Sequence, residues 1–376
     1  MRIFVPKELH PGERRAPLVP ATVKKLVGRG AEIVVESGAG IASGFFDEEY
    51  ATAGAQISAD RQGELGKADM VLRLRKPPEG EVAALKSGCV HVSFLDPFNE
   101  AGLVEQLAAR GVTAISMEMV PRTTLAQKMD ALSSQANLAG YVAVILGAAR
   151  MNKVLPMMMT PAGTITPSRV FVIGVGVAGL QAIATAKRLG ANVEAFDTRP
   201  VVEEQVQSLG AKFVKVDLGE TGQTAQGYAK ELTPEQQAKQ REAMAGVCEK
   251  ADLVITTAQL FGRKAPVIVT SDIVARMKPG AVIVDLAVES GGNVEGSALD
   301  KEVDVNGVTI VGLGNLPGRV CANASQMYSA NLGSLVEHFW DKESKSFKLN
   351  MDDEILKGCV VTHGGAVVNS ALLARR

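Results

Sequence analysis

A glycine-rich turn between a predicted strand and a predicted helix is the feature that most constrains how this chain can fold. An apolar, β-branched run at 170–173 leads into Gly174-x-Gly176-x-x-Gly179, and a helical pattern follows over 178–189. Gly174 permits a tight turn, the missing Cβ of Gly176 leaves room for a pyrophosphate, and Gly179 lets the helix pack closely on the strand. The N-terminus of that helix then faces the phosphates. The pattern in this context is typical of a dinucleotide-binding α/β unit.

An acidic residue at the end of the next predicted strand supports the same interpretation. Asp197 closes the apolar run 192–197, 18 residues beyond Gly179, near the position where the fingerprint places its acid. A carboxylate there accepts hydrogen bonds from ribose hydroxyls and repels a 2′-phosphate, so the sequence predicts NAD rather than NADP. A glycine-rich turn of some other α/β protein is the alternative. The expected cofactor-binding residues are Gly174, Gly176, Val177, Gly179, Asp197, Thr198, Arg199, Tyr228, Thr257 and Ala258.

Length and composition place the chain among globular α/β proteins with two domains. It has 376 residues, 46% of them hydrophobic, and a net charge of −1, so nothing draws it electrostatically to nucleic acid or to a membrane surface. No apolar run approaches the ~18 residues of a membrane span, and the N-terminus lacks the apolar core of a signal peptide. We therefore expect a cytoplasmic protein.

Neither the cysteines nor the histidines predict a chemical site. The cysteines are isolated, without a Cys-x-x-Cys pair, which argues against a zinc site or a disulfide framework, and we expect all of them to be buried or half-buried. The histidines are scattered, and none has an adjacent carboxylate to orient it, so none is predicted to be catalytic. These residues are Cys89, Cys248, Cys321 and Cys359, and His10, His91, His338 and His363.

Strand and helix patterns alternate along both halves of the chain. Such alternation predicts parallel, doubly wound sheets, and hence an α/β protein of two Rossmann-like domains around a cleft. Short apolar strands are expected at 32–36, 69–74, 90–94 and 113–117, and again at 212–216, 251–256, 281–285 and 308–311.

The predicted domain division gives the first domain two separate stretches of sequence. A long helix over 133–149, capped by Ser133, is expected to connect the domains. The last stretch of the chain, from 324 onward, is too short to fold alone, so we expect it to return to the first domain. The division is 1–133 plus 322–376 for the N-terminal domain and 134–321 for the NAD(H)-binding domain.

Two further segments allow more than one interpretation. The stretch 218–232 is polar, rich in Gly, Thr and Gln, and long for a connection, which favours a mobile flap that carries Tyr228 onto bound nucleotide; a solvated insertion without function is the alternative. The run Met-Met-Met-Thr at 157–160 is expected to pack in the core, since Met fills irregular gaps.

A strip of polar residues precedes the predicted linking helix. Arg122, Gln127, Asp130 and Ser133 fall within it, and they are expected at the edge of the cleft, where ligands bind in such folds. A capped, solvated loop has the same spacing and is the alternative. Thr257 and Ala258, at the end of a predicted strand, are expected to line the same cleft.

Several long motifs together resemble one family. The sequence resembles the alanine dehydrogenase and nicotinamide nucleotide transhydrogenase superfamily over almost its whole length, and most of all the NAD(H)-binding component of proton-translocating transhydrogenases. The motifs are Pro-Lys-Glu at 6–8, Glu-Arg-Arg at 13–15, and the stretches 117–122, 126–130, 133–141, 174–190 and 285–293.

Departures from the dehydrogenase pattern separate the two branches of this superfamily. Alanine dehydrogenases carry a lysine and a histidine that bind and activate the amino acid, and the matching positions here hold Arg75 and Asp96. The acid of their Asp-x-Ala-x-Asp pattern is altered to Glu289, while Arg15 is kept. Oxidation of an amino acid therefore lacks its acid/base pair, whereas hydride transfer between two nicotinamides requires only approach and orientation.

The resemblance implies roles and partners for this chain. It implies that Arg122, Asp130 and Ser133 hold the nicotinamide carboxamide and neighbouring groups, that Gln127 bridges toward a second nucleotide, and that Tyr228 closes over NAD. It further implies a homodimer with an NADP(H)-binding subunit and a membrane subunit that conducts protons, which would hold the chain on the inner face of the membrane. The implied enzyme is an NAD(P)+ transhydrogenase of the Si-specific, proton-translocating type. An amino-acid dehydrogenase of the alanine or saccharopine type, and a non-catalytic NAD-binding regulator, remain as alternatives.

Overall fold

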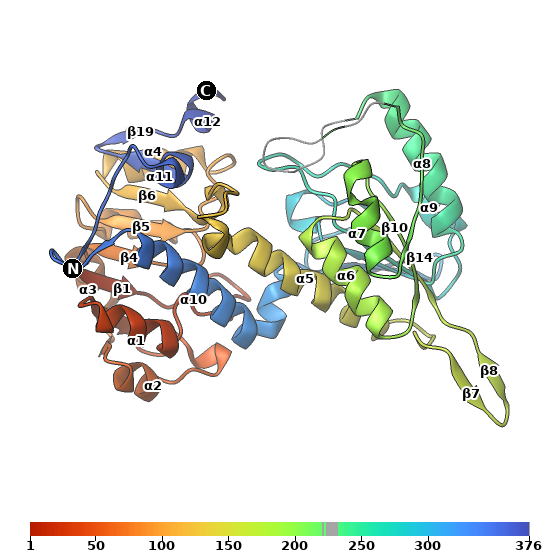
Figure 1. The fold of residues 1–376 in the computed structure, drawn as a ribbon, viewed down its shortest axis with the longest axis horizontal. Coiled ribbons are helices and arrows are strands. Elements are labelled where there is room, and N and C mark those ends of the chain that lie inside the picture. The colour runs from red at the N-terminus through yellow and green to blue at the C-terminus, as the bar shows by residue number, and fades with distance from the viewer. Residues whose placement is uncertain (220–221, 223–231, 376) are drawn as a thin grey trace. The chain divides into compact units, whose positions relative to one another are not determined.

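The computed structural model describes residues 1–219, 222 and 232–375. Its contacts divide the chain into unit 1, Met1–Gln135 with Gly318–Arg376, and unit 2, Ala136–Pro317. The sequence analysis placed these boundaries after residues 133 and 321. The mixed α/β architecture with mainly parallel sheets, predicted from the alternation of strands and helices, is confirmed (Figure 1).

Unit 1 is built on an eight-stranded sheet in the order β19-β18-β6-β5-β4-β1-β2-β3. Strands β1 to β6 pair in parallel in the order 3-2-1-4-5-6, which is the order of a doubly wound dinucleotide fold. The returning C-terminal segment adds β18 and β19 antiparallel at the edge beyond β6. The strands are β1 (Arg2–Val5), β2 (Glu32–Glu36), β3 (Gln56–Ser58), β4 (Met70–Leu72), β5 (Val90–Ser93), β6 (Thr113–Ser116), β18 (Val360–His363) and β19 (Ala366–Val367).

Helix α10, Cys321–His338, attaches the returning segment to unit 1. Its Tyr328 is fully buried in the core and donates a hydrogen bond to the backbone oxygen of Arg73 at 2.8 Å. Its Ser325 and Ser329 hydroxyls accept from the backbone N–H groups of Ala16 and Val19. The other helices of this unit are α1 (Pro20–Gly28), α2 (Asp47–Thr52), α3 (Arg61–Lys67), α4 (Ala101–Ala109), α11 (Glu354–Cys359) and α12 (Ser370–Leu373).

The parallel strands of unit 2 follow the same order, and antiparallel β14 is added at the edge, in a seven-stranded sheet β11-β10-β9-β12-β13-β15-β14. All its pairings are parallel except that of β14 with β15. The strands are β9 (Arg169–Ile173), β10 (Asn192–Phe196), β11 (Lys212–Phe213), β12 (Leu253–Thr256), β13 (Val282–Asp285), β14 (Lys301–Val305) and β15 (Val308–Gly312), and the helices are α6 (Val177–Arg188), α7 (Glu203–Ser208), α8 (Pro234–Cys248) and α9 (Ser271–Arg276).

Helix α5, Ala131–Ala148, is the predicted linking helix, but the expectation that Ser133 caps it is wrong. Ser133 lies inside the helix rather than capping it, because Asp130 precedes the first turn and its carboxylate accepts the Ser133 N–H at 2.8 Å. The helix is also long and apolar enough to span a membrane, with a mean hydropathy of 1.3 and 39% of it buried. It has no charged residue, and its hydropathy comes largely from Ala, Leu and Val. One such helix is weak evidence, since the core helix of a soluble protein meets the same criterion.

The methionine run that was expected in the core is instead exposed. Strands β7 (Met158–Thr160) and β8 (Gly163–Ile165) form an antiparallel hairpin that projects from unit 2 in Figure 1. Met157, Met158 and Met159 are 60%, 44% and 77% exposed. Composition could not distinguish a Met that fills a core gap from one that coats a hairpin, because both are apolar and unbranched.

Candidate functional site

The glycine turn of unit 2 has the geometry that the fingerprint predicts. Gly174 follows β9 with φ +93°, and a Cβ there would lie 2.6 Å from the Thr257 hydroxyl. A Cβ on Gly179 would lie 1.9 Å from the backbone oxygen of Gly174. Gly174 is therefore required by its positive φ and by the close approach of the Thr257 loop, and Gly179 by the packing of α6 against the turn.

Gly176 differs from the other two glycines because the space in front of it is open. A Cβ there would meet no atom within 4 Å, and Gly176 is exposed at the N-cap of α6 without a side-chain cap. The N–H groups of the first turn of the helix, beginning at half-buried Val177, have no intrahelical partners. The open N-terminus of a helix favours an anion.

The loop after β12 is held beside this turn by buried polar groups. The Thr257 hydroxyl donates to the Gly174 oxygen at 3.0 Å, and Ala258 exchanges two hydrogen bonds with the Asn293 side chain, at 3.0 and 2.8 Å. The backbone N–H of Asn293 is held in turn by the Asp285 carboxylate at 3.1 Å. Asn293 and Asp285 are fully buried. The sequence patterns assigned them no role, although a buried carboxylate at the end of a predicted strand was the available signal.

Asp197 lies at the carboxyl end of β10, next to the glycine turn. Its carboxylate accepts the backbone N–H of Val175 at 2.7 Å and forms an ion pair with the Arg199 guanidinium at 2.8 Å. Thr198 between them is half-buried. The turn, the acid and the Thr257 loop therefore meet at the carboxyl edge of one sheet, at the switch point between β9 and β12, where ligands bind in open α/β sheets. Tyr228 lies outside the described residues, as does most of the predicted flap.

Three of the four residues predicted in the polar strip are brought together in unit 1. Asp130 accepts the Ser133 hydroxyl at 2.6 Å and its N–H at 2.8 Å, and the Arg122 guanidinium lies 3.8 Å from the same carboxylate. Gln127 lies on the preceding 3-10 turn, Gln127–Met129, with its side chain exposed. Arg122 is also exposed, so the cluster presents one guanidinium and one amide at the surface of unit 1.

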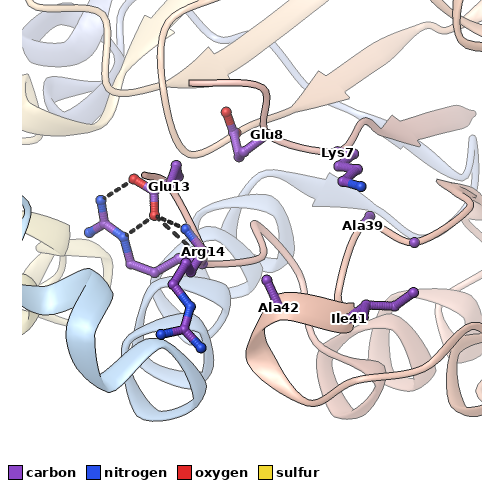
Figure 2. Close-up of a pocket in the computed structure, with 9 residues that line it drawn as sticks. Lys7, Glu8, Glu13, Arg14, Ala39, Ile41 and Ala42 are labelled. Carbon is purple, nitrogen blue, oxygen red and sulfur yellow. Dashed lines mark hydrogen bonds and ion pairs between the residues drawn. The ribbon is translucent and has the colours of Figure 1, made fainter. Parts of the chain in front are cut away.

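A second charged group surrounds Glu13 near a cavity of about 170 Å³ in unit 1. Glu13 is held between Arg15, at 2.7 Å, and Arg75, at 2.9 Å. Figure 2 shows Glu13 among the residues that line the cavity, with dashed lines from its carboxylate to neighbouring nitrogen atoms. Burial would raise the pKa of Glu13, but the hydrogen bonds and charges of the arginines outweigh burial and hold that pKa at about 2. The Arg15 guanidinium also donates to Gln135 at 2.8 Å. Both arginines are thus already engaged by a carboxylate of the chain itself.

A buried ionic cluster occupies the carboxyl ends of β1 and β4 in unit 1, and sequence reasoning missed it. Arg73 is fully buried and paired with Glu81, and Glu8 accepts the Leu74 N–H at 2.7 Å. Within the described residues, Glu8 Oε2, Arg73 Nε and Nη1, and His91 Nδ1 have no hydrogen-bond partner. Burial raises the pKa of Glu8 and, with the charge of Arg73, lowers the pKa of His91 to about 3. A charged residue after the apolar run 70–72 was the signal in the sequence, since a buried charge must be paired.

The prediction that the cysteines are buried or half-buried is confirmed. All four cysteines are buried and free, and burial raises the pKa of the Cys89, Cys248 and Cys359 thiols to about 12. Among the described residues, no group of three His, Cys, Asp or Glu side chains could hold a metal ion.

Comparison with known proteins covers nearly the whole chain. Residues 4–139 match the family described as "Alanine dehydrogenase/PNT, N-terminal domain", and residues 143–370 match "Alanine dehydrogenase/PNT, C-terminal domain". The chain is 48% identical to a protein of Rhodospirillum rubrum named as the first portion of NAD(P) transhydrogenase subunit alpha, over 99% of each chain. The crystal structure of transhydrogenase from Sinorhizobium meliloti superposes with a TM-score of 0.89 at 45% identity, over 98% of this chain and 100% of that one. Alanine dehydrogenase of Bacillus subtilis is 31% identical over 85% of this chain and 80% of its own. The chain belongs to the alanine dehydrogenase/PNT family.

Proposed function

We propose that this chain is the NAD(H)-binding component of a proton-translocating NAD(P) transhydrogenase. The observation that carries the proposal is its 48% identity, over 99% of both chains, to a relative named as a transhydrogenase alpha subunit, against 31% to an alanine dehydrogenase. NAD(H) would exchange hydride directly with NADP(H) bound on a partner subunit, and a membrane subunit would couple that exchange to proton movement. The Si stereochemistry stays a prediction.

The residues of unit 2 fit the nucleotide that the proposal requires. The open space at Gly176 accommodates a pyrophosphate against the N-terminus of α6, starting at Val177. Asp197 would accept the adenosine ribose hydroxyls, and Thr257 and Ala258 would line the path toward the nicotinamide. Gly174 and Gly179 shape the turn. Thr198 and Arg199 would border the ribose, and Tyr228 would close over the nucleotide.

In unit 1, the Arg122–Asp130–Ser133 cluster supports a role in positioning. Asp130 fixes the Ser133 hydroxyl and faces the Arg122 guanidinium, so donors and acceptors suited to a carboxamide lie together. Gln127, exposed beside them, would bridge toward the second nucleotide. Hydride transfer needs no proton donor from the protein, so these residues would act by fixing approach and orientation.

The amino-acid dehydrogenase alternative has less support. Arg15 and Arg75 share the Glu13 carboxylate, and Asp96 has φ +50° and accepts the Asn99 amide at 2.9 Å. Burial raises the pKa of Asp96, although the Asn99 amide opposes that rise. An amino acid would have to displace Glu13, and no histidine stands at position 96 to move its proton.

Hydride transfer with and without a partner distinguishes the two enzymes. The purified chain is mixed with an NADP(H)-binding transhydrogenase subunit, and reduction of a nicotinamide-modified NAD analogue by NADPH is followed. We expect transfer only with the partner and no oxidation of L-alanine with NAD. Oxidation of L-alanine by the chain alone would overturn the proposal.

Gln127→Asn tests the positioning role. We expect NADH affinity to stay nearly unchanged while single-turnover transfer with the partner slows by about 100-fold, as a ~1 Å misplacement can cost. Gln106→Asn, the same change at an exposed position of α4, is the matched control. A Gln127→Asn protein with normal transfer would remove Gln127 from the site.

The homodimer is also a proposal, and the hairpin β7–β8 supports it. A two-stranded hairpin is marginally stable by itself in water, and this one exposes Met157, Met159 and Ile165. A second copy of the chain would cover them. We expect light scattering to give a dimer for the wild type and a monomer for Met159→Glu. The control is Leu299→Glu, at another exposed apolar residue of unit 2, which we expect to stay dimeric. A monomeric wild type would reject this arrangement.

A further inference from the structure

The hydrogen bonds around Asp197 leave its carboxylate with no free acceptor position. Oδ2 accepts the Val175 N–H at 2.7 Å and Arg199 Nη2 at 2.8 Å. Oδ1 accepts the Arg199 backbone N–H at 2.9 Å and Arg199 Nε at 2.9 Å. An ionised carboxylate offers about four lone-pair sites, so all of them are used. The pair is well covered, with side-chain exposures of 6% for Asp197 and 13% for Arg199.

Two of these four bonds come from backbone groups and two from a side chain. The Val175 and Arg199 N–H groups are fixed by the turn after β9 and by the chain after β10, so they cannot leave without unfolding the loop. The Nε and Nη2 groups of Arg199 belong to a flexible side chain that also donates from Nη2 to the Val175 oxygen at 3.2 Å. Only the guanidinium can therefore vacate the carboxylate.

A ribose diol presents two hydroxyl donors, which match the two positions that the guanidinium occupies. We propose that Arg199 is an internal competitor for the adenosine ribose site, so that the ribose hydroxyls of a bound nucleotide exchange one for one with the guanidinium on Asp197. This inference rests on the proposed function and concerns how the same site is regulated. The exchange weakens nucleotide binding, because a charge-assisted bidentate pair must break first.

The same pair affects the choice between NADH and NADPH. While Arg199 is paired with Asp197, the carboxylate repels a 2′-phosphate less than an unpaired carboxylate would. Once Arg199 is displaced, its guanidinium remains only two residues away in the sequence and attracts that phosphate. Arg199 therefore lowers both affinity for NADH and discrimination against NADPH. Without it, Asp197 would face the ribose with its full charge.

The test compares equilibrium binding of NADH, NADPH and ADP to the wild type, Arg199→Leu and Arg199→Gln. ADP reports the adenosine half alone. We expect both variants to bind NADH and ADP at least about tenfold more tightly, because the variants lose both charged hydrogen bonds that compete for Asp197. We also expect the ratio of the NADPH to the NADH dissociation constant to rise. Lys212→Leu removes an equally charged group from neighbouring strand β11, where it pairs with Glu194. This control shows how much the loss of one positive charge weakens the electrostatic attraction of an anionic nucleotide. We expect Lys212→Leu not to bind NADH or ADP more tightly than the wild type does.

The outcomes separate this inference from the function on which it rests. If the wild type binds NADH and both variants bind it equally or more weakly, Arg199 supports the nucleotide directly and the competitor role is wrong, while the proposed function stands. If the wild type binds neither NADH nor ADP, both are wrong. The two variants differ in size and polarity, and a thermal melt of each establishes that it is folded before titration.

Discussion

The two units share a strand order but use the same place in it differently. In unit 2 the carboxyl ends of β9 and β12 carry Gly174 and Thr257 and border the open N-terminus of α6. In unit 1 the carboxyl ends of the matching strands, β1 and β4, are followed by Glu8 and Arg73, which are buried. One sheet has a switch point open to a ligand, and the other has a switch point filled by its own charges. Strand order thus fixes where a site can form, and the side chains at that place decide whether one does.

Removing Arg73 should have the largest effect on unit 1. Arg73→Leu leaves the buried Glu8 without the nearby charge of Arg73 and takes from Glu81 one of its two arginine partners, since Arg61 stays paired with Glu81 at 2.7 Å. Breaking a buried pair in this way costs about 3–5 kcal/mol. The chain's one tryptophan, Trp340, is buried in unit 1, so its fluorescence during denaturant unfolding reports this unit. Lys86→Leu, which removes the exposed partner of Asp69, is the control without measurable effect. Wild-type stability in Arg73→Leu would mean that the cluster does not hold unit 1 together.

Gly179→Ala should produce the largest loss in unit 2. The added Cβ would lie 1.9 Å from the Gly174 oxygen, a backbone atom that cannot move away cheaply. Overpacking of this kind costs about 1–3 kcal/mol, occasionally more. Far-UV circular dichroism during thermal unfolding measures the loss, and Trp340 fluorescence shows whether unit 1 is spared. A variant as stable as the wild type would show that α6 does not need the close approach.

His91 should make unit 1 sensitive to acid. The unfolded histidine takes up a proton near pH 6.5, whereas the folded one, with its pKa lowered by burial, does so only at about 3. Between these values the unfolded state binds more protons, so stability falls as the pH falls, by about 1.4 kcal/mol per pH unit at most. His91→Leu removes this titration. The free energy of unfolding, measured from pH 6.5 to 4, should therefore fall more for the wild type than for His91→Leu. Parallel curves for the two proteins would contradict the assignment.

Gly176→Ala should change stability least. The new methyl group meets no atom within 4 Å, and φ of −82° suits alanine. We expect the free energy of unfolding to change by no more than about 0.5 kcal/mol, as for an ordinary surface substitution. We expect NADH affinity to fall, because the methyl group occupies the space of the pyrophosphate. Paired with Gly179→Ala, this variant separates a glycine kept for folding from one kept for ligand. Unchanged NADH affinity would place the pyrophosphate elsewhere.

The sequence predicted the sheets and the glycine turn because both depend on local patterns. The strand at 170–173, the helix at 178–189 and the acid at 197 lie within one βαβ unit, where spacing determines geometry. The clustering of Arg122, Asp130 and Ser133 could also be predicted from the sequence, since Asp130 and Ser133 are three residues apart on one turn.

Interactions between distant segments of the sequence could not be predicted in this way. Arg73 lies in the core only because α10, with Tyr328, covers the sheet, and that packing has no local signature. The occupancy of Asp197 by Arg199 is local, but its geometry depends on backbone angles that spacing does not reveal. The exposure of Met157 to Met159 depends on a hairpin whose surroundings composition does not specify.

The discontinuity of unit 1 has a consequence for the nascent chain. Strand β18 pairs with β6, and the whole of unit 2 lies between these two strands in the sequence. The edge of the unit 1 sheet is therefore left open until residues 360–363 have emerged from the ribosome. Unit 2 is continuous and complete by Pro317. At about 5–20 residues per second of synthesis, unit 2 is free to fold for several seconds while unit 1 still exposes the strand edge that β18 will cover. Aggregation during translation should therefore begin at β6, and chaperones that protect unpaired strands would have their binding site there.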